Sequence, residues 1–162
     1  MKTLLLLRHA KSSWADERVA DFDRPLNERG RSDAPRMGEL LARQELLPDL
    51  IITSSAKRAA TTAKSVAKAA GYEGEIRRSE RLYLAEPGEY VVTAQHMDDS
   101  VNCLMLVGHH PGLEELVEWR SGQDERMPTA ALACIRLPID RWRDLKPDQK
   151  YELVNVWRPK EL

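Results

Sequence analysis

The stretch MKTLLLLRHAKSSW, residues 1–14, decides the fold of this chain. Residues 2–7 form an apolar run of strand length, and its leucines do not alternate with polar residues. A strand of this kind is typical of the centre of a sheet that is covered on both faces. The run leads directly into Arg8 and His9. The sequence therefore predicts a buried central strand that ends on two groups able to carry positive charge.

The composition predicts one domain spanning residues 1–162, because a chain of 162 residues is of ordinary single-domain size. The formal net charge is -1, so no overall field favours nucleic acid or an anionic membrane as a partner. No apolar stretch approaches the roughly 18–20 residues that span a bilayer, and the leucine run is too short for a signal peptide. Cys103 and Cys134 lack CxxC spacing and are expected as buried thiols. We expect a cytoplasmic protein.

Apolar runs of strand length alternate with longer segments of helical periodicity along the chain. This alternation predicts an α/β fold, a three-layer sandwich in which helices flank a mostly parallel central sheet. The expected strands cover residues 2–7, 49–53, 75–77, 101–108, 131–137 and 151–157, and the last two form an antiparallel pair. The first helix leaves two alternatives open, since either it bends at Pro35 or its regular part begins near Ser32.

Three junctions between a strand and the following helix each carry a cationic group. The first junction has Arg8 and His9, the second has Arg58, and the third has His109 and His110. In an open parallel sheet, ligands bind in the crevice beyond the carboxyl ends of the strands, so these side chains can converge. Arginine forks and helix N-termini favour a compact anion, above all phosphate. Two adjacent histidines with no carboxylate or cysteine cluster make a metal site improbable.

The same segments resemble a known family. LLLRHAKSS (residues 5–13), SSAKRAATTA (54–63) and VGHHPG (107–112) look like the three motifs of the histidine phosphatase superfamily, which includes cofactor-dependent phosphoglycerate mutases. Ala10 stands where many members have glycine. Together with DRPLNERG (23–30) and MPTAALA (127–133), the short chain is most similar to the SixA-like branch of phosphohistidine phosphatases.

The resemblance implies a phosphoglycerate mutase-like fold and a set of catalytic residues. It implies that His9 is the nucleophile, that Arg8 and Arg58 bind the phosphoryl oxygens, and that His109 is the second catalytic histidine. Phosphoryl transfer depends mainly on positioning and charge stabilisation, which arginines and a histidine supply without a metal or another cofactor. We expect nearby cations to lower the pKa of His9, and a backbone carbonyl to fix its tautomer.

One residue of the superfamily pattern is missing. Many superfamily phosphatases have a glutamate that protonates the leaving oxygen, and here that position falls at Leu84 within RLYLAEPGEY (residues 81–90). The nearest acids are Glu86 and Glu89, and Glu86 is either a candidate general acid or part of a solvated loop. Imidazole is a far less basic leaving group than an alkoxide, so a site without a committed acid favours phosphohistidine over alkyl esters.

The sequence therefore predicts a metal-independent phosphatase that acts through a phosphohistidine enzyme intermediate. Its substrate would be phosphohistidine on a signalling or phosphotransfer protein. The alternatives are a phosphomonoesterase for a small phosphorylated substrate, with Glu86 or Glu89 as the acid, and a non-catalytic phosphate-binding module. Four further residues fall in matching or adjoining segments and are candidates to line the site without an assigned role: Trp14, Arg24, Thr129 and Ala130.

Overall fold

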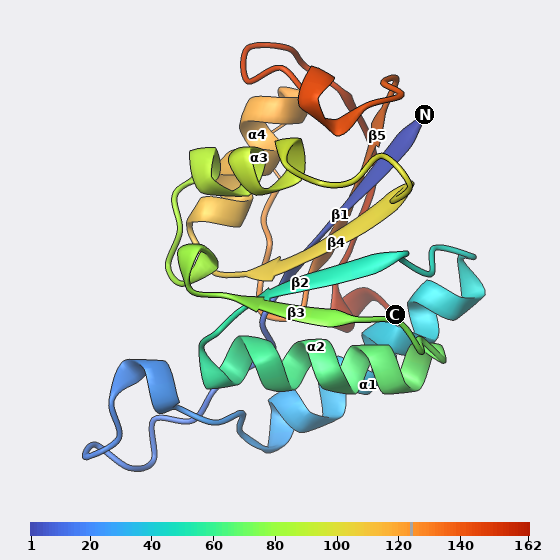
Figure 1. Ribbon diagram of the computed structural model, residues 1–162. Coiled ribbons are helices and arrows are strands. Elements are labelled where there is room, and N and C mark those ends of the chain that lie inside the picture. The colour runs from blue at the N-terminus through green and yellow to red at the C-terminus, as the bar shows by residue number, and fades with distance from the viewer. Residues whose placement is uncertain (124) are drawn as a thin grey trace.

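The fold is a six-stranded sheet between two pairs of helices, seen in a computed structural model that describes residues 1–123 and 125–162 (Figure 1). The strands are β1 (Lys2–Arg8), β2 (Leu50–Ser54), β3 (Ile76–Ser79), β4 (Cys103–Gly108), β5 (Leu132–Leu137) and β6 (Glu152–Trp157). The α-helices are α1 (Glu28–Arg43), α2 (Lys57–Ala70), α3 (Pro87–Gln95) and α4 (Gly112–Ser121). Short 3-10 helices cover Asp21–Asp23, Glu80–Leu82, Trp142–Asp144 and Pro159–Glu161.

The order of the strands brings three of their carboxyl ends together. The strand order is β3-β2-β4-β1-β5-β6. Strands β3, β2, β4 and β1 are parallel to one another, whereas β5 pairs antiparallel with β1 on one side and with β6 on the other. Val107 of β4 pairs with Leu7 of β1 on one side and with Thr53 of β2 on the other. The ends of β2, β4 and β1 are therefore level and adjacent, as the α/β prediction requires for a common site.

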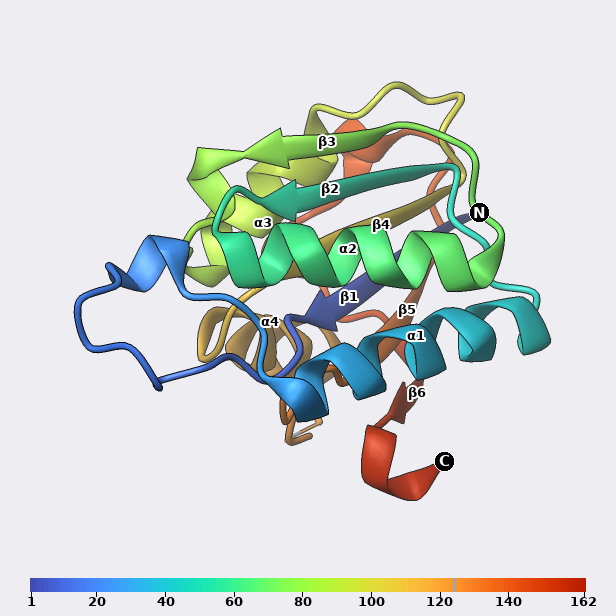
Figure 2. The ribbon, with the colours of Figure 1, turned by 90° about the horizontal axis from the view of Figure 1, so that it is seen from below.

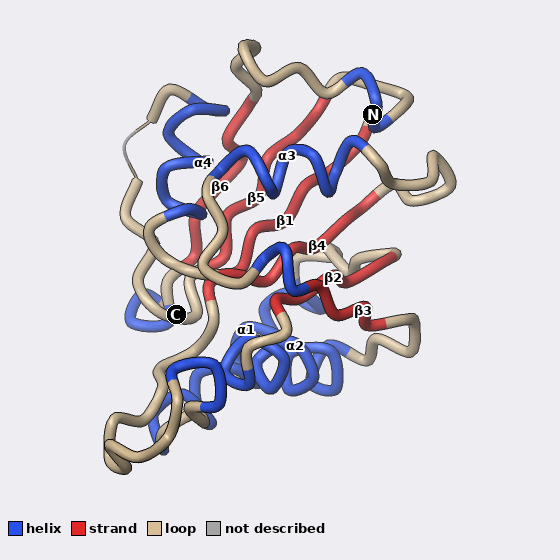
Figure 3. The backbone as a smooth tube through the Cα atoms, turned by 60° about the vertical axis from the view of Figure 1, so that its left-hand side comes forward, coloured by secondary structure: helices blue, strands red, loops and turns tan. Residues whose placement is uncertain are grey.

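The leucines of β1 divide between two apolar layers. Leu4 and Leu6 pack in the layer beneath α3 and α4, whereas Leu5 and Leu7 pack in the layer beneath α1 and α2. All four are buried, with at most 3% of their surface accessible. Figure 2 shows α1 and α2 lying across one face of the sheet, and Figure 3 shows α3 and α4 on the other. The prediction of a central strand covered on both faces is confirmed.

The structure shows where the first helix begins, which the sequence leaves open. It begins at Glu28, because the Asn27 side chain accepts a hydrogen bond from the Gly30 amide at 2.9 Å, and it continues past Pro35. A start near Ser32 is therefore wrong. A Cβ on Gly30 would lie 2.1 Å from the Lys11 carbonyl oxygen, so glycine permits the loop after β1 to cross the start of α1.

The structure also shows how far the two cysteines and two of the tryptophans are buried. Cys103 and Cys134 are free thiols in the described structure. Cys134 is buried as expected, but the expectation of burial is wrong for Cys103, which is partly exposed at the start of β4. Trp142 is buried, whereas Trp119 is 53% exposed because α4 turns Leu116 and Val117 toward the sheet instead. Within the described residues, no helix is both long enough and apolar enough to cross a membrane.

Candidate active site

A cavity of about 270 Å³ lies at the carboxyl ends of β1, β2 and β4. Arg8 is the last residue of β1, Arg58 lies in the first turn of α2, and His109 follows β4. The structure brings all four predicted residues into this one cavity, which is lined by Arg8, His9, Lys11, Ser12, Trp14, Asp21, Arg24, Arg58, Leu84, His109, His110 and Thr129.

The backbone fixes His9 between two strands. Its amide donates to the Gly108 carbonyl at 3.0 Å, and its own carbonyl accepts from the Ala130 amide at 3.0 Å. The Nδ1 atom of the ring lies 2.7 Å from the Ala10 carbonyl oxygen. A carbonyl can only accept, so Nδ1 carries the proton and the lone pair of a neutral ring is on Nε2. The expected backbone acceptor is therefore present, and the tautomer suits nucleophilic attack through Nε2.

Burial keeps both site histidines neutral. It lowers the pKa of His9 to about 3. The Ala10 hydrogen bond has the second largest effect and opposes this lowering, and His109, Arg58 and Arg8 each lower the pKa further. Burial also lowers the pKa of His109 to about 4, followed by the charge of Arg58. We expected the neighbouring cations to lower the His9 pKa, and they do, but loss of water around the ring is the larger cause.

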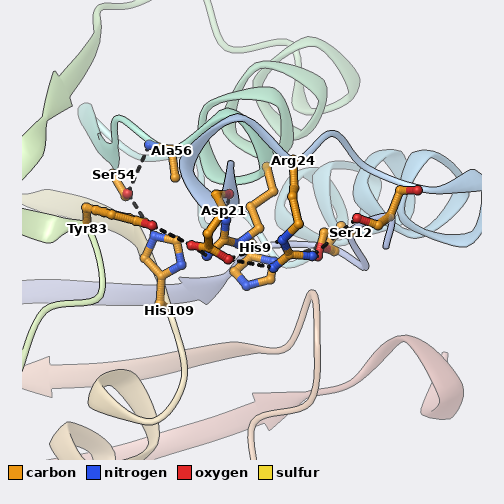
Figure 4. Close-up of polar contacts among 11 residues, drawn as sticks. His9, Ser12, Asp21, Arg24, Ser54, Ala56, Tyr83 and His109 are labelled. Atoms are coloured by element: carbon orange, nitrogen blue, oxygen red, sulfur yellow. Dashed lines mark hydrogen bonds and ion pairs between the residues drawn. The ribbon is translucent and has the colours of Figure 1, made fainter. Parts of the chain in front are cut away.

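His109 is held by two hydroxyl groups. Its Nε2 lies 2.8 Å from the Ser54 hydroxyl (Figure 4). Its backbone amide donates to the Tyr90 hydroxyl at 3.1 Å. A Cβ on Gly108 would lie 2.1 Å from the Tyr90 oxygen, so only glycine leaves room for this contact. When Ser54 donates to Nε2, the neutral ring carries its proton on Nδ1. The centroids of the two histidine rings are 5.2 Å apart.

Three nitrogen atoms of the site are buried without a hydrogen-bond partner: Arg8 Nε, Arg58 Nε and His109 Nδ1. In the described part of the chain only one other buried side-chain polar atom, Arg120 Nε, is unpaired in this way. Buried polar groups are almost always paired, since an unpaired one costs on the order of 1–3 kcal/mol. All three residues line the same cavity as His9, so the arrangement is suited to holding an oxyanion beside that histidine.

Asp21 is a site residue that sequence reasoning missed. Its carboxylate accepts from Arg58 Nη2 at 3.1 Å, from Arg24 Nε at 3.1 Å and from the Tyr83 hydroxyl (Figure 4). Burial acts to raise the pKa of Asp21, but Tyr83 and the two arginines outweigh it and lower the pKa to about 2. In the sequence, only the i,i+3 spacing of Asp21 and Arg24 indicates that these two residues form an ion pair.

The candidate general acid is not in the cavity. Glu86 is the exposed N-cap residue of α3, and Glu89 is exposed in the first turn of that helix. Among the described lining residues, Asp21 is the sole carboxylate. Leu84, at the position where the resemblance expects glutamate, does line the cavity and is 55% exposed. An acidic role for Glu86 stays a prediction that this geometry does not support.

The rim of the cavity carries several candidates without assigned roles. Trp14 is 70% exposed, and the guanidinium of Arg24 stacks on its ring at 3.6 Å. Thr129 lines the cavity. Ala130 does not line it, but its backbone amide donates a hydrogen bond to the His9 carbonyl. His110 lies at the rim, 3.6 Å from Glu114. The described residues form no group of three or more histidines, cysteines and acids placed to share a metal ion.

Comparison with known proteins agrees with this geometry. The sequence model of the histidine phosphatase superfamily (branch 1) matches residues 4–91. An uncharacterized protein of Mycobacterium tuberculosis is 34% identical over 152 residues, which cover 87% of this chain and 92% of the relative. A 2,3-bisphosphoglycerate-dependent phosphoglycerate mutase of Mycobacterium leprae is 36% identical over 129 residues, 78% of this chain but 49% of the mutase. A crystal structure from Agrobacterium tumefaciens, assigned as the phosphohistidine phosphatase SixA, is 32% identical with a TM-score of 0.80 and 98% coverage of both chains.

Proposed function

The chain belongs to the histidine phosphatase superfamily, a family of phosphatases and mutases, and we propose that it is a metal-independent phosphohistidine phosphatase. Its substrate would be a signalling or phosphotransfer protein that carries phosphohistidine. One observation carries the proposal: the unprotonated Nε2 of His9 shares its cavity with three unpaired nitrogen atoms, while the sole carboxylate among the described lining residues, Asp21, is held by two arginines. The cytoplasm would be the site of this activity.

The first step uses the lone pair of His9 Nε2. This nitrogen attacks phosphorus, and the P–N bond of the substrate breaks. The electron pair of that bond stays on the departing imidazole nitrogen, which takes a proton from water. Arg8, Arg58 and His109 donate hydrogen bonds to the three oxygens over which negative charge spreads.

The second step releases phosphate. A water molecule attacks the phosphorus of phosphorylated His9, the new P–N bond breaks, and its electron pair returns to Nε2. The water loses its proton to solvent, and inorganic phosphate remains. The Ala10 carbonyl keeps the proton on Nδ1 in both steps, so the same ring nitrogen accepts and returns the phosphoryl group.

The identity of the leaving group follows from the acid that the cavity lacks. An alkoxide needs a proton donor, and a positioned general acid contributes typically about 10²–10⁴-fold. The pKa of Asp21 is about 2, so this carboxylate is ionised at neutral pH and cannot donate. Leu84 supplies no proton, and the two glutamates of α3 are outside the cavity. Imidazole is a far less basic leaving group that takes its proton from water, so it depends less on a positioned acid, which favours a phosphoramidate substrate.

The test compares a phosphoramidate with p-nitrophenyl phosphate, using wild-type protein and the His9→Ala variant with EDTA present. We expect wild-type protein to prefer the phosphoramidate and to form an acid-labile, alkali-stable phosphoprotein, and both activities to vanish in His9→Ala. EDTA should have no effect, whereas inhibition by EDTA would overturn the metal-independent mechanism.

Two other outcomes would replace the proposal. A preference for alkyl esters that is lost in Glu86→Gln would identify a phosphomonoesterase for small substrates, an activity compatible with the similarity to phosphoglycerate mutases. Tight phosphate binding with neither labelling nor turnover would identify a non-catalytic phosphate-binding module.

A further inference from the structure

Asp21 holds two arginines of the cavity on one carboxylate. Its Oδ2 accepts from Arg58 Nη2 and its Oδ1 from Arg24 Nε, both at 3.1 Å, while its backbone carbonyl accepts from Arg58 Nη1 at 2.7 Å. Two guanidinium groups so close to one another would repel without an anion between them. The carboxylate therefore determines where both arginines lie.

Other contacts limit the freedom of this cluster. The Tyr83 hydroxyl donates to Asp21 Oδ2, and the edge of the Tyr83 ring faces His109 with centroids 5.5 Å apart. Arg24 also donates to the Ser12 hydroxyl at 2.6 Å and stacks on Trp14. The loop after β1, the start of α2 and the segment before α3 thus meet at one carboxylate (Figure 4).

A fixed negative charge beside a phosphate site is unexpected, because it repels the ligand. Asp21 lines the same cavity as His9, and 41% of its side chain is accessible. Its low pKa keeps it charged whenever the enzyme would bind phosphate. A neutral Asn or Gln would avoid this repulsion, but it has one accepting oxygen and an amide nitrogen that only donates, so it could not accept from both arginines in the same way. The charge itself therefore has a consequence for the strength of phosphate binding.

We propose that Asp21 is a positioning residue that places Arg58 and Arg24 together for the phosphoryl group, and that its charge weakens product binding so that inorganic phosphate leaves. Arg24 thereby becomes a third phosphoryl-binding arginine beside Arg8 and Arg58. This inference rests on the proposed function, because it assigns roles within the same site.

The decisive measurement is the Kd of inorganic phosphate by titration calorimetry, together with kcat and KM for the phosphoramidate. Asp21→Asn keeps an oxygen acceptor but removes the charge, so phosphate should bind roughly 5–10-fold tighter. Its kcat should fall about 10-fold, because Arg58 loses its charged partner and phosphate leaves more slowly. Asp21→Glu keeps the charge, and its phosphate Kd should stay within about threefold of wild type.

Asp16→Asn is the matched control. Asp16 lies in the same loop and pairs at 3.1 Å with Arg18, which is 91% exposed. The same substitution there should change neither kcat nor the Kd of phosphate. If Asp21 were only a structural residue, Asp21→Asn would weaken phosphate binding and lower the melting temperature together. That result, or an unchanged Kd, would overturn the proposal.

A second pair of variants covers the case in which Asp21→Asn does not fold. Arg24→Gln should weaken phosphate binding by about 10-fold, and an unchanged Kd would contradict the role of Arg24. The double variant Asp21→Asn with Arg24→Gln restores the charge balance and should bind phosphate within about threefold of wild type. Phosphate binding needs no turnover, so an inactive wild-type protein would refute the proposed function while leaving this series interpretable.

Discussion

The floor and the rim of the cavity differ in how they are built. The floor consists of residues at strand ends and helix starts, where Arg58, His9 and His109 are 3%, 7% and 1% exposed. The rim consists of loop residues, and there Trp14 and Leu84 are 70% and 55% exposed. The regular elements fix the floor, whereas the rim is free to differ without disturbing the sheet. From this contrast we propose that the reaction takes place on the floor and that the rim selects the substrate.

The largest effect should come from the nucleophile on the floor. In His9→Ala no phosphoenzyme can form, so phosphoramidate turnover should fall by at least roughly 10³-fold. His96→Ala, at the exposed end of α3, is the control and should retain full turnover. Rates and phosphoprotein labelling measured on both variants check this, and residual labelling of His9→Ala would point to another nucleophile.

Removal of a floor arginine should have the next largest effect. Arg58→Gln keeps a polar side chain but loses the guanidinium, and we expect kcat/KM to drop by about 10²–10³-fold. Lys57→Gln changes the adjacent, exposed residue in the same turn of α2 and should have little effect. Steady-state kinetics of the two variants compares them directly, and equal losses would mean that overall charge, not the positioned fork, matters.

The buried histidines of the floor should make stability depend on pH. Burial lowers the pKa of His9 from 6.5 to about 3, so the unfolded chain binds more protons than the native protein between those values. Stability is therefore full above about pH 6.5 and is lost as the pH falls toward 3. In His9→Gln, unfolding should take up to about one proton fewer between these pH values, so the free energy of unfolding should depend less steeply on pH.

Urea unfolding at several pH values checks this prediction. His96→Gln, which replaces an exposed histidine, should leave the slope unchanged. An unchanged slope in His9→Gln would mean that His9 titrates normally in the folded protein. His109, whose pKa burial lowers to about 4, contributes to stability in the same direction.

A change at the rim should alter the preference for a leaving group. Leu84→Glu places a carboxyl at the position where the superfamily pattern has a proton donor. We expect turnover of an alkyl phosphate to rise by about 10-fold or more, with little change for the phosphoramidate. Val92→Glu on α3 adds the same charge outside the cavity and should not raise ester turnover. No gain in Leu84→Glu would mean that the missing acid does not determine the substrate.

The smallest effect should come from the exposed tryptophan of the rim. Trp14→Ala removes an apolar contact for a protein substrate, so KM for a phosphohistidine protein should rise about 3–10-fold. KM for a small phosphoramidate should stay within about twofold, since that molecule fits the cavity floor. Trp119→Ala, which removes an exposed tryptophan of α4, serves as the control. Equal changes for both substrates would contradict a docking role for Trp14.

Much of the floor could be predicted from sequence because its residues follow regular elements. The leucine run predicted a central strand, and the carboxyl ends of parallel strands meet by geometry, so Arg8, Arg58 and His109 were expected together. The start of α1 could not be predicted, because Pro35 allowed either a bend in the helix or a regular start near Ser32. The exposure of Trp119 could not be predicted, since apolar character alone does not say which side of a short helix faces the sheet.

The sequence by itself determined the layered fold and the identity of the buried groups around His9. Only the tertiary structure decided what surrounds them. Asp21 reaches Arg58 across 37 residues and Tyr83 across 62, and it is the path of the loop across α1 that makes these contacts. The same packing leaves Glu86 outside the cavity at the start of α3. Strand and helix patterns are local and repeat along the chain, whereas the course of a loop depends on distant contacts that no local pattern records.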